Sequence, residues 1–315
     1  MKSAGDPLAE TLLTENMWRT PAVLFALLAL IVEPGAQVCA AQTIVPPPDV
    51  ANSISTKQPN PHSNSAAGAP SGEDSVAESE LLAAANKSRA MAGVPSLRVD
   101  DTMRQAAAQH AWLMIEHGQL EHHFAGESPL LQRIALVSPL SMDHAGENIA
   151  YANCARNVDT ALMNSPPHRE NLLDRGFNVA GIAAIWSHGR LYVVQDFARE
   201  VPSYSARQSG RLVSEAIGEL RLQARLAVLD QQAAPTLDAA ACSLARDDHP
   251  NAHLLAAAYD NRKIITYAAS YPEQLPSSAT RMLREAGVHQ FAVGTCYARN
   301  TAYPTGTYWI AILLY

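Results

Sequence analysis

The chain has few aromatic residues (6%) and few charged ones (17%), and its net charge is −7. No basic patch interleaved with aromatic residues occurs, so nucleic acid is not an expected partner. No Gly-x-Ser-x-Gly segment occurs either, which removes the nucleophile elbow typical of serine hydrolases. What remains is an alanine- and leucine-rich globular protein whose 315 residues suffice for two ordinary domains.

Long apolar runs are also missing. The apolar stretch over 21–32 is shorter than the roughly 20 residues that a membrane-spanning helix needs. Pro34 and Gly35 break it, and small residues follow around Cys39, a pattern typical of an export signal. We therefore expect a signal peptide over 1–41 and a secreted or periplasmic protein with no transmembrane span in the mature chain. An acidic stretch before Met17 suggests Met17 as the true start, and an uncleaved anchor is the alternative.

Residues 42–75 have the composition of a linker. Three prolines over 46–48 are followed by Ser, Asn, Ala and Gly, without apolar periodicity. Such a segment cannot bury enough surface to order itself, so it predicts a disordered tether.

Helical and strand patterns alternate over 76–200 and predict an α+β domain. The expected elements are a helix that ends near Gly93, a helix that begins at Asp100 or Asp101 and ends at Gly118, and antiparallel strands over 179–186 and 191–197. His110 lies on the apolar face of the second helix and is expected to be a buried structural histidine.

The segment Ser165-Pro166-Pro167-His168-Arg169 has the signals of a helix start. Serine is a preferred N-cap residue and proline suits the first helical position. His168 then falls in the first turn, where the helix dipole favours a neutral imidazole. Glu147, in Gly-Glu-Asn, and His122 lie upstream, so the sequence predicts a polar cleft of two histidines and a carboxylate.

The order of these segments resembles the CAP superfamily, which groups cysteine-rich secretory, antigen 5 and pathogenesis-related 1 proteins, and most closely its bacterial SCP-type domains. The resemblance covers about 79–200 and rests on Asn86-x-x-Arg89, Gly93, Leu97, His122, Gly146-Glu147-Asn148-Ile149, Ser165-Pro-Pro-His168-Arg169-x-Asn171-Leu172-Leu173 and Val194-Gln195-Asp196-Phe197. It implies an α-β-α sandwich with a cleft.

The resemblance also implies a metal site. In this family two histidines and one or two acidic residues line the cleft, and the histidines can hold Zn²⁺. Here His122, whose spacing fits better than that of His123, and His168 would be the ligands, with Glu147 contacting the metal-bound water. A second acidic position has no clear counterpart, Asp159 being a weak match. The alternative is a metal-free hydrogen-bonded network.

Residues 207–315 predict a second, smaller α+β unit, with a helix over 211–229 and a terminal hairpin over 291–297 and 306–314. Short matches link it to the first unit: Pro235–Leu237 to Pro95–Leu97, Ser277–Arg281 to Ser165–Arg169 (with Thr280 in place of the histidine) and Gly294 to Gly181. We hypothesise a degenerate CAP-like repeat without the polar cleft. The alternative is an unrelated α+β domain.

Three cysteines would survive signal removal. Cys242 and Cys296 fall in the C-terminal unit, where they form either a disulfide bridge or two small buried apolar contacts. Cys154 would remain a lone thiol or a packed core residue.

Three function classes remain. The favoured one is an extracytoplasmic binding or interaction module that engages a lipid, an envelope polymer or a protein through its His/Glu-lined cleft. The second is a metal-assisted hydrolase that uses Glu147 and His168 as candidate catalytic residues. The third is a structural cell-envelope protein. The lack of a nucleophile with a paired base weighs against an enzyme.

Overall fold

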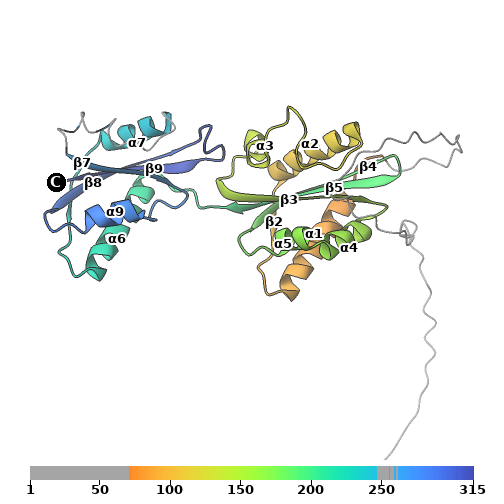
Figure 1. Ribbon diagram of the computed structural model, residues 1–315, viewed down its shortest axis with the longest axis horizontal. Coiled ribbons are helices and arrows are strands. Elements are labelled where there is room, and N and C mark those ends of the chain that lie inside the picture. Colours follow the sequence, from red (N-terminus) through yellow and green to blue (C-terminus); the bar gives the residue numbers. More distant parts are fainter. Residues whose placement is uncertain (1–70, 247–254, 256–258, 260–261) are drawn as a thin grey trace, which may run out of the picture. The chain divides into compact units, whose positions relative to one another are not determined.

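The computed structural model describes residues 71–315 except 247–254, 256–258 and 260–261. The expected signal peptide over 1–41 and most of the expected linker lie outside the described residues. Within the described part, no helix has the length and apolar character to span a membrane. The described chain forms two β-sheets, each with its own helices (Figure 1).

The first unit is a three-layer α-β-α sandwich, as the family resemblance implies. Its elements are β1 (Gly72–Glu73), α1 (Ser75–Met91), β2 (Arg98–Val99), α2 (Asp101–His117), α3 (Leu130–Val137), β3 (Met142–Ala152), α4 (Ala155–Asn164), α5 (Pro166–Leu173), β4 (Val179–Ser187) and β5 (Arg190–Glu200). The strand order is β1-β4-β5-β3, with β2 parallel to β4. Helices α1, α4 and α5 cover one face of the sheet, and α2 and α3 cover the other (Figure 1).

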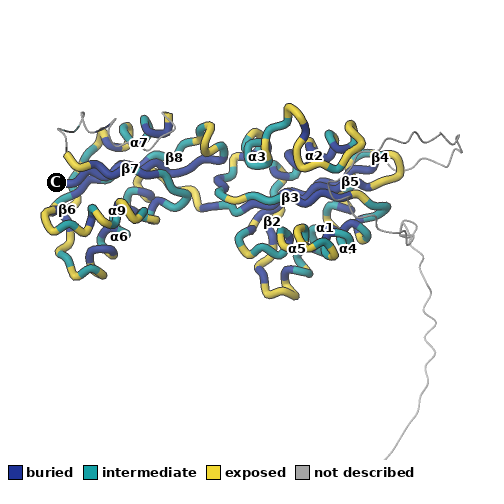
Figure 2. The backbone as a smooth tube through the Cα atoms, viewed as in Figure 1, coloured by how far each residue is buried: buried dark blue, intermediate teal, exposed yellow. Residues whose placement is uncertain are grey.

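Burial on both faces explains the apolar composition of β4 and β5, which are buried along almost their whole length (Figure 2). Ile182 and Ala184 face α1 and α4, whereas Ala183 and Ile185 face α2. Successive strand residues point to opposite faces, so an uninterrupted apolar run is what a central strand between two helical layers requires.

Order begins earlier than the expected linker boundary at residue 75. Strand β1 pairs with Ile185 and Trp186 of β4. Asp74 caps α1 by accepting from the Val76 and Ala77 amides, and its second oxygen accepts from Trp186 Nε1 at 2.8 Å. These backbone and side-chain bonds order 71–75, which composition alone assigned to the tether.

The second unit has a smaller sheet with the same connections. Its elements are α6 (Ala206–Gln223), β6 (Asp230–Gln231), α7 (Leu237–Arg246), β7 (Lys263–Ala269), α9 (Ser277–Leu283), β8 (Gln290–Ala298) and β9 (Thr307–Leu314). The strand order β6-β8-β9-β7, with β6 parallel to β8, reproduces β2-β4-β5-β3 of the first unit. Helices α6 and α9 lie on one face and α7 on the other (Figure 1).

A buried arginine stands at the same place in both units. Arg89 near the end of α1 donates to the carbonyls of Pro95, Leu172, Asp174 and Phe177. Arg221 near the end of α6 donates to the carbonyls of Ala227, Leu283 and Glu285. Each guanidinium ties the end of its helix to a loop and to a second, short helix.

A close backbone approach also recurs. A Cβ atom on Gly181 of β4 would lie 2.2 Å from the carbonyl carbon of Met103, at the start of α2. A Cβ atom on Gly294 of β8 would lie 2.3 Å from that of Leu237, at the start of α7. Together with the shared strand order, these features support the hypothesis of a degenerate repeat.

Three details of the expected second unit are wrong. Helix α6 begins at 206 and ends at 223, rather than spanning 211–229, because Ser205 and Gln208 form a capping box and Arg225 takes a positive φ of 57°. The carbonyls of Leu172 and Leu283 accept from the equivalent arginines Arg89 and Arg221, so the two leucines correspond. Counting back from them, Ala279 rather than Thr280 takes the place of His168. Leu229, not Leu237, precedes the short parallel strand as Leu97 does.

Cys242 of α7 and Cys296 of β8 form a disulfide with Cα atoms 5.1 Å apart. Cys154 is disulfide-bonded too, so it is neither a lone thiol nor a packed apolar residue as expected. No cysteine among the described residues is free.

Candidate functional site

An exposed histidine rests on a buried carboxylate in the first unit. The His122 side chain is 58% exposed and that of Glu147, on β3, is 4% exposed. His122 Nδ1 lies 2.8 Å from Glu147 Oε1. Because an ionised carboxylate only accepts, the proton lies on Nδ1. This tautomer leaves the lone pair on Nε2, which has no hydrogen-bond partner among the described residues.

The second predicted histidine is close by. Pro166 occupies the first turn of α5 and Ser165 the N-cap position, although the Ser165 side chain makes no capping bond, contrary to expectation. Burial lowers the pKa of His168, and the positive charge that His122 carries when it is protonated lowers it further. His168 is therefore a neutral imidazole near neutral pH, within electrostatic range of His122.

Asn148 fixes the position of α5. Its amide nitrogen donates to the His168 carbonyl at 3.0 Å, and its oxygen accepts from Asn171 at 3.1 Å. Asn171 also donates to the Glu147 carbonyl. Asn148 therefore braces the start of a helix.

A buried arginine lies beneath Glu147. The Arg133 side chain, from α3, is 4% exposed and donates to Oε2 of Glu147 and, at 3.0 Å, to Glu127. Burial tends to raise the pKa of Glu147, but the hydrogen bond from His122 and the charge of Arg133 hold it below its ordinary value. Glu147 is therefore an ionised, fully engaged carboxylate.

Asp196 completes the buried cluster. It lies directly opposite Glu147 in the β3–β5 register, is fully buried, and has Oδ1 3.5 Å from Arg133 Nη2. Burial and the neighbouring Glu147 charge raise its pKa well above the ordinary value. Of the carboxyl groups around Arg133, Asp196 is therefore the one whose surroundings favour the protonated form.

His110 is a buried structural histidine, as predicted. Its Nε2 donates to the Glu121 carbonyl at 2.9 Å and its Nδ1 lies 2.7 Å from Glu127. Sequence reasoning assigned no role to Glu127, Arg133 or Asp196. A signal existed for two of them: Arg133 interrupts the apolar helix α3 and Asp196 an apolar strand, and charges in such places are paired.

Asp159 and three further histidines of the first unit make contacts of their own. Asp159 lines a separate small hollow between α1 and α4, of about 160 Å³, together with Glu80. It is not the missing acidic residue of the cleft. His117 stacks on Phe124 and His144 on Phe177, while His123 contacts the Glu127 carbonyl.

Metal coordination by these residues is limited to two imidazoles. Among the described residues, no group of three or more His, Cys, Asp or Glu side chains is arranged to hold a metal ion. Each oxygen of Glu147 already accepts from another side chain. His122 Nε2 and the His168 ring are imidazole donors of the kind that transition-metal ions accept, and the further ligands of such an ion would come from outside the protein.

Comparison with known proteins gives one family match. Residues 82–197 match the model described as CAP, the cysteine-rich secretory protein family. No curated protein matches the chain. Similar solved structures include an outer surface protein of Borrelia burgdorferi, with 21% identity and a TM-score of 0.39, over 42% of this chain and 99% of that one.

Two further structures extend this comparison. An extracellular protein with an SCP domain from Bacillus anthracis strain Ames has 25% identity and a TM-score of 0.36, over 40% of this chain and 41% of that one. Na-ASP-1 has 9% identity and a TM-score of 0.44, over 79% of this chain and 91% of that one.

Proposed function

Residues 82–197 belong to the CAP family, and from that premise we propose that this protein is an extracytoplasmic binding module that recognises its partner through His122 and His168. The observation that carries the proposal is the anchoring of an exposed imidazole, His122, on the buried carboxylate of Glu147. A histidine held in one tautomer presents a defined acceptor to a ligand.

The disulfides support the extracytoplasmic location. Such bonds persist in oxidising compartments and are rare in the cytosol. Cys242, Cys296 and Cys154 are all disulfide-bonded. The apolar segment over 21–32 is consistent with export.

Glu147 acts as a positioning residue in this proposal. Arg133 keeps it ionised, and the ionised carboxylate fixes the His122 tautomer. The partner is an envelope polymer, a lipid headgroup or a protein group. It binds either to a Zn²⁺-class ion that the two histidines hold or directly to the histidines. A bound ion would be held by His122 and His168 and would supply Lewis acidity toward that group.

The hydrolase alternative has one supporting observation. A carboxylate that orients a histidine, as Glu147 orients His122, is the arrangement of an activated general base. In that case His122 Nε2, rather than Glu147 or His168, would take the proton from water, because Glu147 is engaged on both oxygens. Hydrolysis lost in His122→Ala, with the fold intact, would support this candidate.

Calorimetric titration of the full chain with ZnCl₂ tests the binding proposal. We expect one site per chain with Kd in the micromolar range, about −8 kcal/mol, and at least about a tenfold loss in His122→Ala and in His168→Ala. His289→Ala removes an exposed histidine of the second unit and is the matched control. Equal Zn²⁺ affinity in all four proteins would rule out these imidazoles as the metal site.

A further inference from the structure

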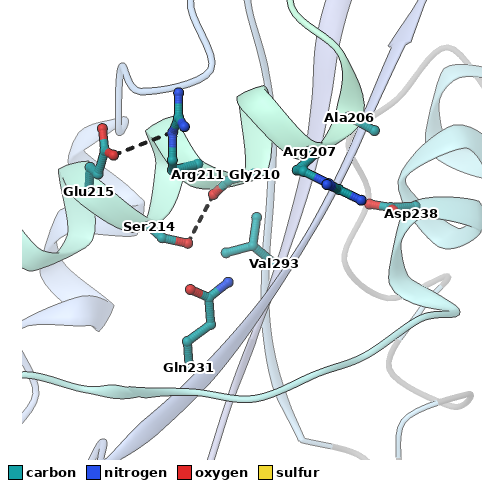
Figure 3. Close-up of a pocket in the computed structure, with 9 residues that line it drawn as sticks. All are labelled: Ala206, Arg207, Gly210, Arg211, Ser214, Glu215, Gln231, Asp238 and Val293. Carbon is teal, nitrogen blue, oxygen red and sulfur yellow. Dashed lines mark hydrogen bonds and ion pairs between the residues drawn. The ribbon is translucent and has the colours of Figure 1, made fainter.

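The second unit contains a cavity of about 650 Å³, within the range of small-molecule sites. Its lining includes Arg207, Gly210 and Arg211 of α6, Gln231 of β6, Asp238 of α7 and Val293 of β8. Figure 3 shows Ser214, Gln231 and Val293 around the hollow, with Arg207 and Arg211 on the same helix.

In the first unit the corresponding place is filled by the protein's own charges. Glu78 of α1 accepts from the Ala184 amide of β4 and pairs with Arg104 of α2 at 3.3 Å. Glu73 of β1 also pairs with Arg104, at 3.0 Å. A carboxylate, a guanidinium and a short strand therefore close this side of the first sheet.

The second unit lacks these groups. Glu78 and Gly210 lie the same number of residues before the buried arginines Arg89 and Arg221, so Gly210 takes the place on α6 that Glu78 has on α1. The backbone of Arg104 lies beside Gly181 and that of Asp238 lies beside Gly294, so Asp238 takes the place of Arg104. No described strand takes the place of β1. The cavity lies where Gly210 supplies no side chain and where β6, whose pairing ends at Phe291, leaves the edge of β8 open at Val293.

Cationic groups at the cavity are available to a ligand. Arg207 has no hydrogen bond or ion pair with any described residue. Arg211 pairs with Glu215 at 3.5 Å, but both side chains are more than 60% exposed, so this pair exchanges partners at little cost. An incoming carboxylate would restore at Arg207 and Arg211 the kind of pair that Glu78 makes with Arg104.

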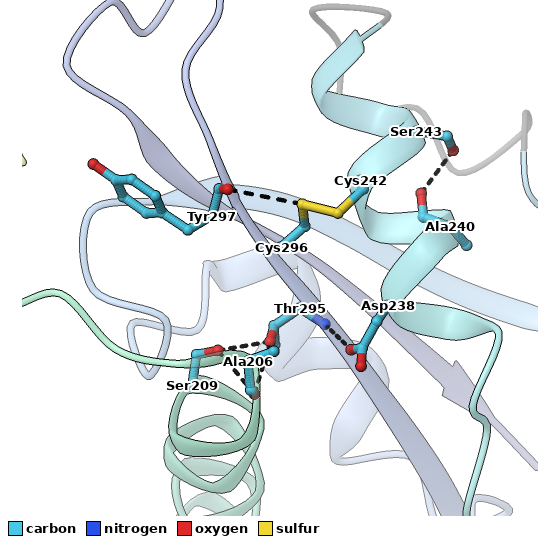
Figure 4. Close-up of a disulfide and its surroundings, with 9 residues drawn as sticks. All are labelled: Ala206, Ser209, Asp238, Ala240, Cys242, Ser243, Thr295, Cys296 and Tyr297. Atoms are coloured by element: carbon cyan, nitrogen blue, oxygen red, sulfur yellow. Dashed lines mark hydrogen bonds between the residues drawn. A yellow bond between two sulfur atoms is a disulfide. The ribbon is translucent and has the colours of Figure 1, made fainter.

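The opposite wall offers acceptors and a strand edge. Asp238 Oδ1 accepts from the Thr295 amide at 2.8 Å (Figure 4), and its other oxygen can accept from a ligand. The Phe291 carbonyl accepts from the Gln232 amide at 2.7 Å, and the Thr295 amide donates to Asp238, so alternate residues of β8 turn their backbone groups toward this edge. Val293 lies between Phe291 and Thr295 in this alternation, and its backbone groups therefore face the same edge.

We propose that this cavity binds the C-terminal end of an extended peptide, with its carboxylate on Arg207 and Arg211 and its amide groups against Val293 and Asp238. Addition of a peptide to an open strand edge with capture of its terminal carboxylate is an established recognition mode. The carboxylate of Asp238 disfavours a ligand that is purely anionic, such as phosphate, and favours one that also donates an N–H group.

The test is a nuclear magnetic resonance titration of the ¹⁵N-labelled full chain with N-acetyl-Ala-Ala, its C-terminal amide and inorganic phosphate. We expect the free acid to shift the amides of Gly210, Gln231 and Val293 saturably, and the amide and phosphate to bind at least about tenfold more weakly. The double variant R207Q/R211Q should lose binding by a similar factor, whereas Arg246→Gln, an exposed arginine of α7 outside the cavity, should not.

A second variant guards against loss of binding through misfolding. Gly210→Glu restores the carboxylate of the first unit, and a Cβ atom at Gly210 meets no atom within 4 Å, so the helix tolerates it. We expect it to fold and to lose peptide binding because its own carboxylate competes for the arginines. Equal shifts with acid and amide, shifts away from the cavity, or no shift up to about 10 mM peptide would overturn the proposal.

Discussion

His122 donates from Nδ1 to Oε1 of Glu147 across 2.8 Å, which joins an imidazole that is 58% exposed to a carboxylate that is 4% exposed. The ionised form of Glu147 is held from below by Arg133. Surface chemistry at His122 therefore depends on ion pairs that solvent does not reach.

Removal of Arg133 should cost more stability than removal of an exposed arginine. In Arg133→Met, Glu147 and Glu127 lose their buried cation, and breaking such a pair costs about 3–5 kcal/mol. Arg98→Met is the matched control, because the Arg98–Glu200 pair is largely exposed and should cost less than about 1 kcal/mol. Urea unfolding of both variants measures the difference. Similar losses in the two variants would contradict the role given to Arg133.

Asp196→Asn should gain stability relative to the native chain as pH rises. The pKa of Asp196 is raised in the folded state by burial and by Glu147. The stability that the protonated Asp196 contributes is therefore fully present below the unfolded pKa of about 3.8 and is lost as the pH rises through the pKa of the folded state. Asparagine mimics the protonated acid and does not titrate. The stability difference should grow by up to about 1.4 kcal/mol per pH unit between those pKa values, measured by unfolding from pH 4 to pH 9. A difference that stays constant with pH would mean that Asp196 is ionised.

Gly181→Ala and Gly294→Ala should both destabilise the protein. In each case the added methyl would lie within 2.3 Å of backbone at the start of a helix, and overpacking of this kind costs about 1–3 kcal/mol. Gly210→Ala is the control, because open space surrounds that position and alanine should add about 0.5–1 kcal/mol to a helix interior. Thermal unfolding distinguishes these outcomes. A neutral Gly294→Ala would show that the second unit does not share the close approach of the first.

The double variant C242S/C296S should be less stable by about 2–4 kcal/mol. The bond joins α7 to β8 across a sequence separation of 54, which restricts the unfolded chain (Figure 4). Chemical unfolding of the oxidised proteins measures the loss, and leaves the disulfide at Cys154 unchanged. A loss below about 0.5 kcal/mol would show that packing around α7, rather than the cross-link, holds this layer together.

Much of the first unit follows from local sequence signals. Asp100 and Gly118 bound α2, and the apolar runs over 179–186 and 191–197 give the central hairpin. The order of motifs also identifies the family and places His122, Glu147 and His168 as site candidates. These signals are local because caps and strand periodicity act within a few residues.

The buried half of the site depends on pairings that are distant in sequence. Asp196 meets Glu147 only through the β3–β5 register, and Arg133 reaches both from a separate helix. A single sequence does not fix which strands are neighbours, so these partners could not be named. The cavity in the second unit could not be predicted either, because the correspondence of Gly210 with Glu78 becomes visible only when the order of elements in the two units is known. Expectations for residues 1–70 remain predictions.

The proposed function depends most on the anchored tautomer of His122 beside His168. Long-range ¹H–¹⁵N correlation spectra of the imidazoles, recorded for the native chain and for Glu147→Gln, test this tautomer directly. We expect His122 as the Nδ1–H tautomer in the native chain, a mixture of tautomers in the variant, and joint perturbation of His122 Nε2 and His168 by ZnCl₂. An Nε2–H tautomer in the native chain, or a response to ZnCl₂ confined to other histidines, would contradict it.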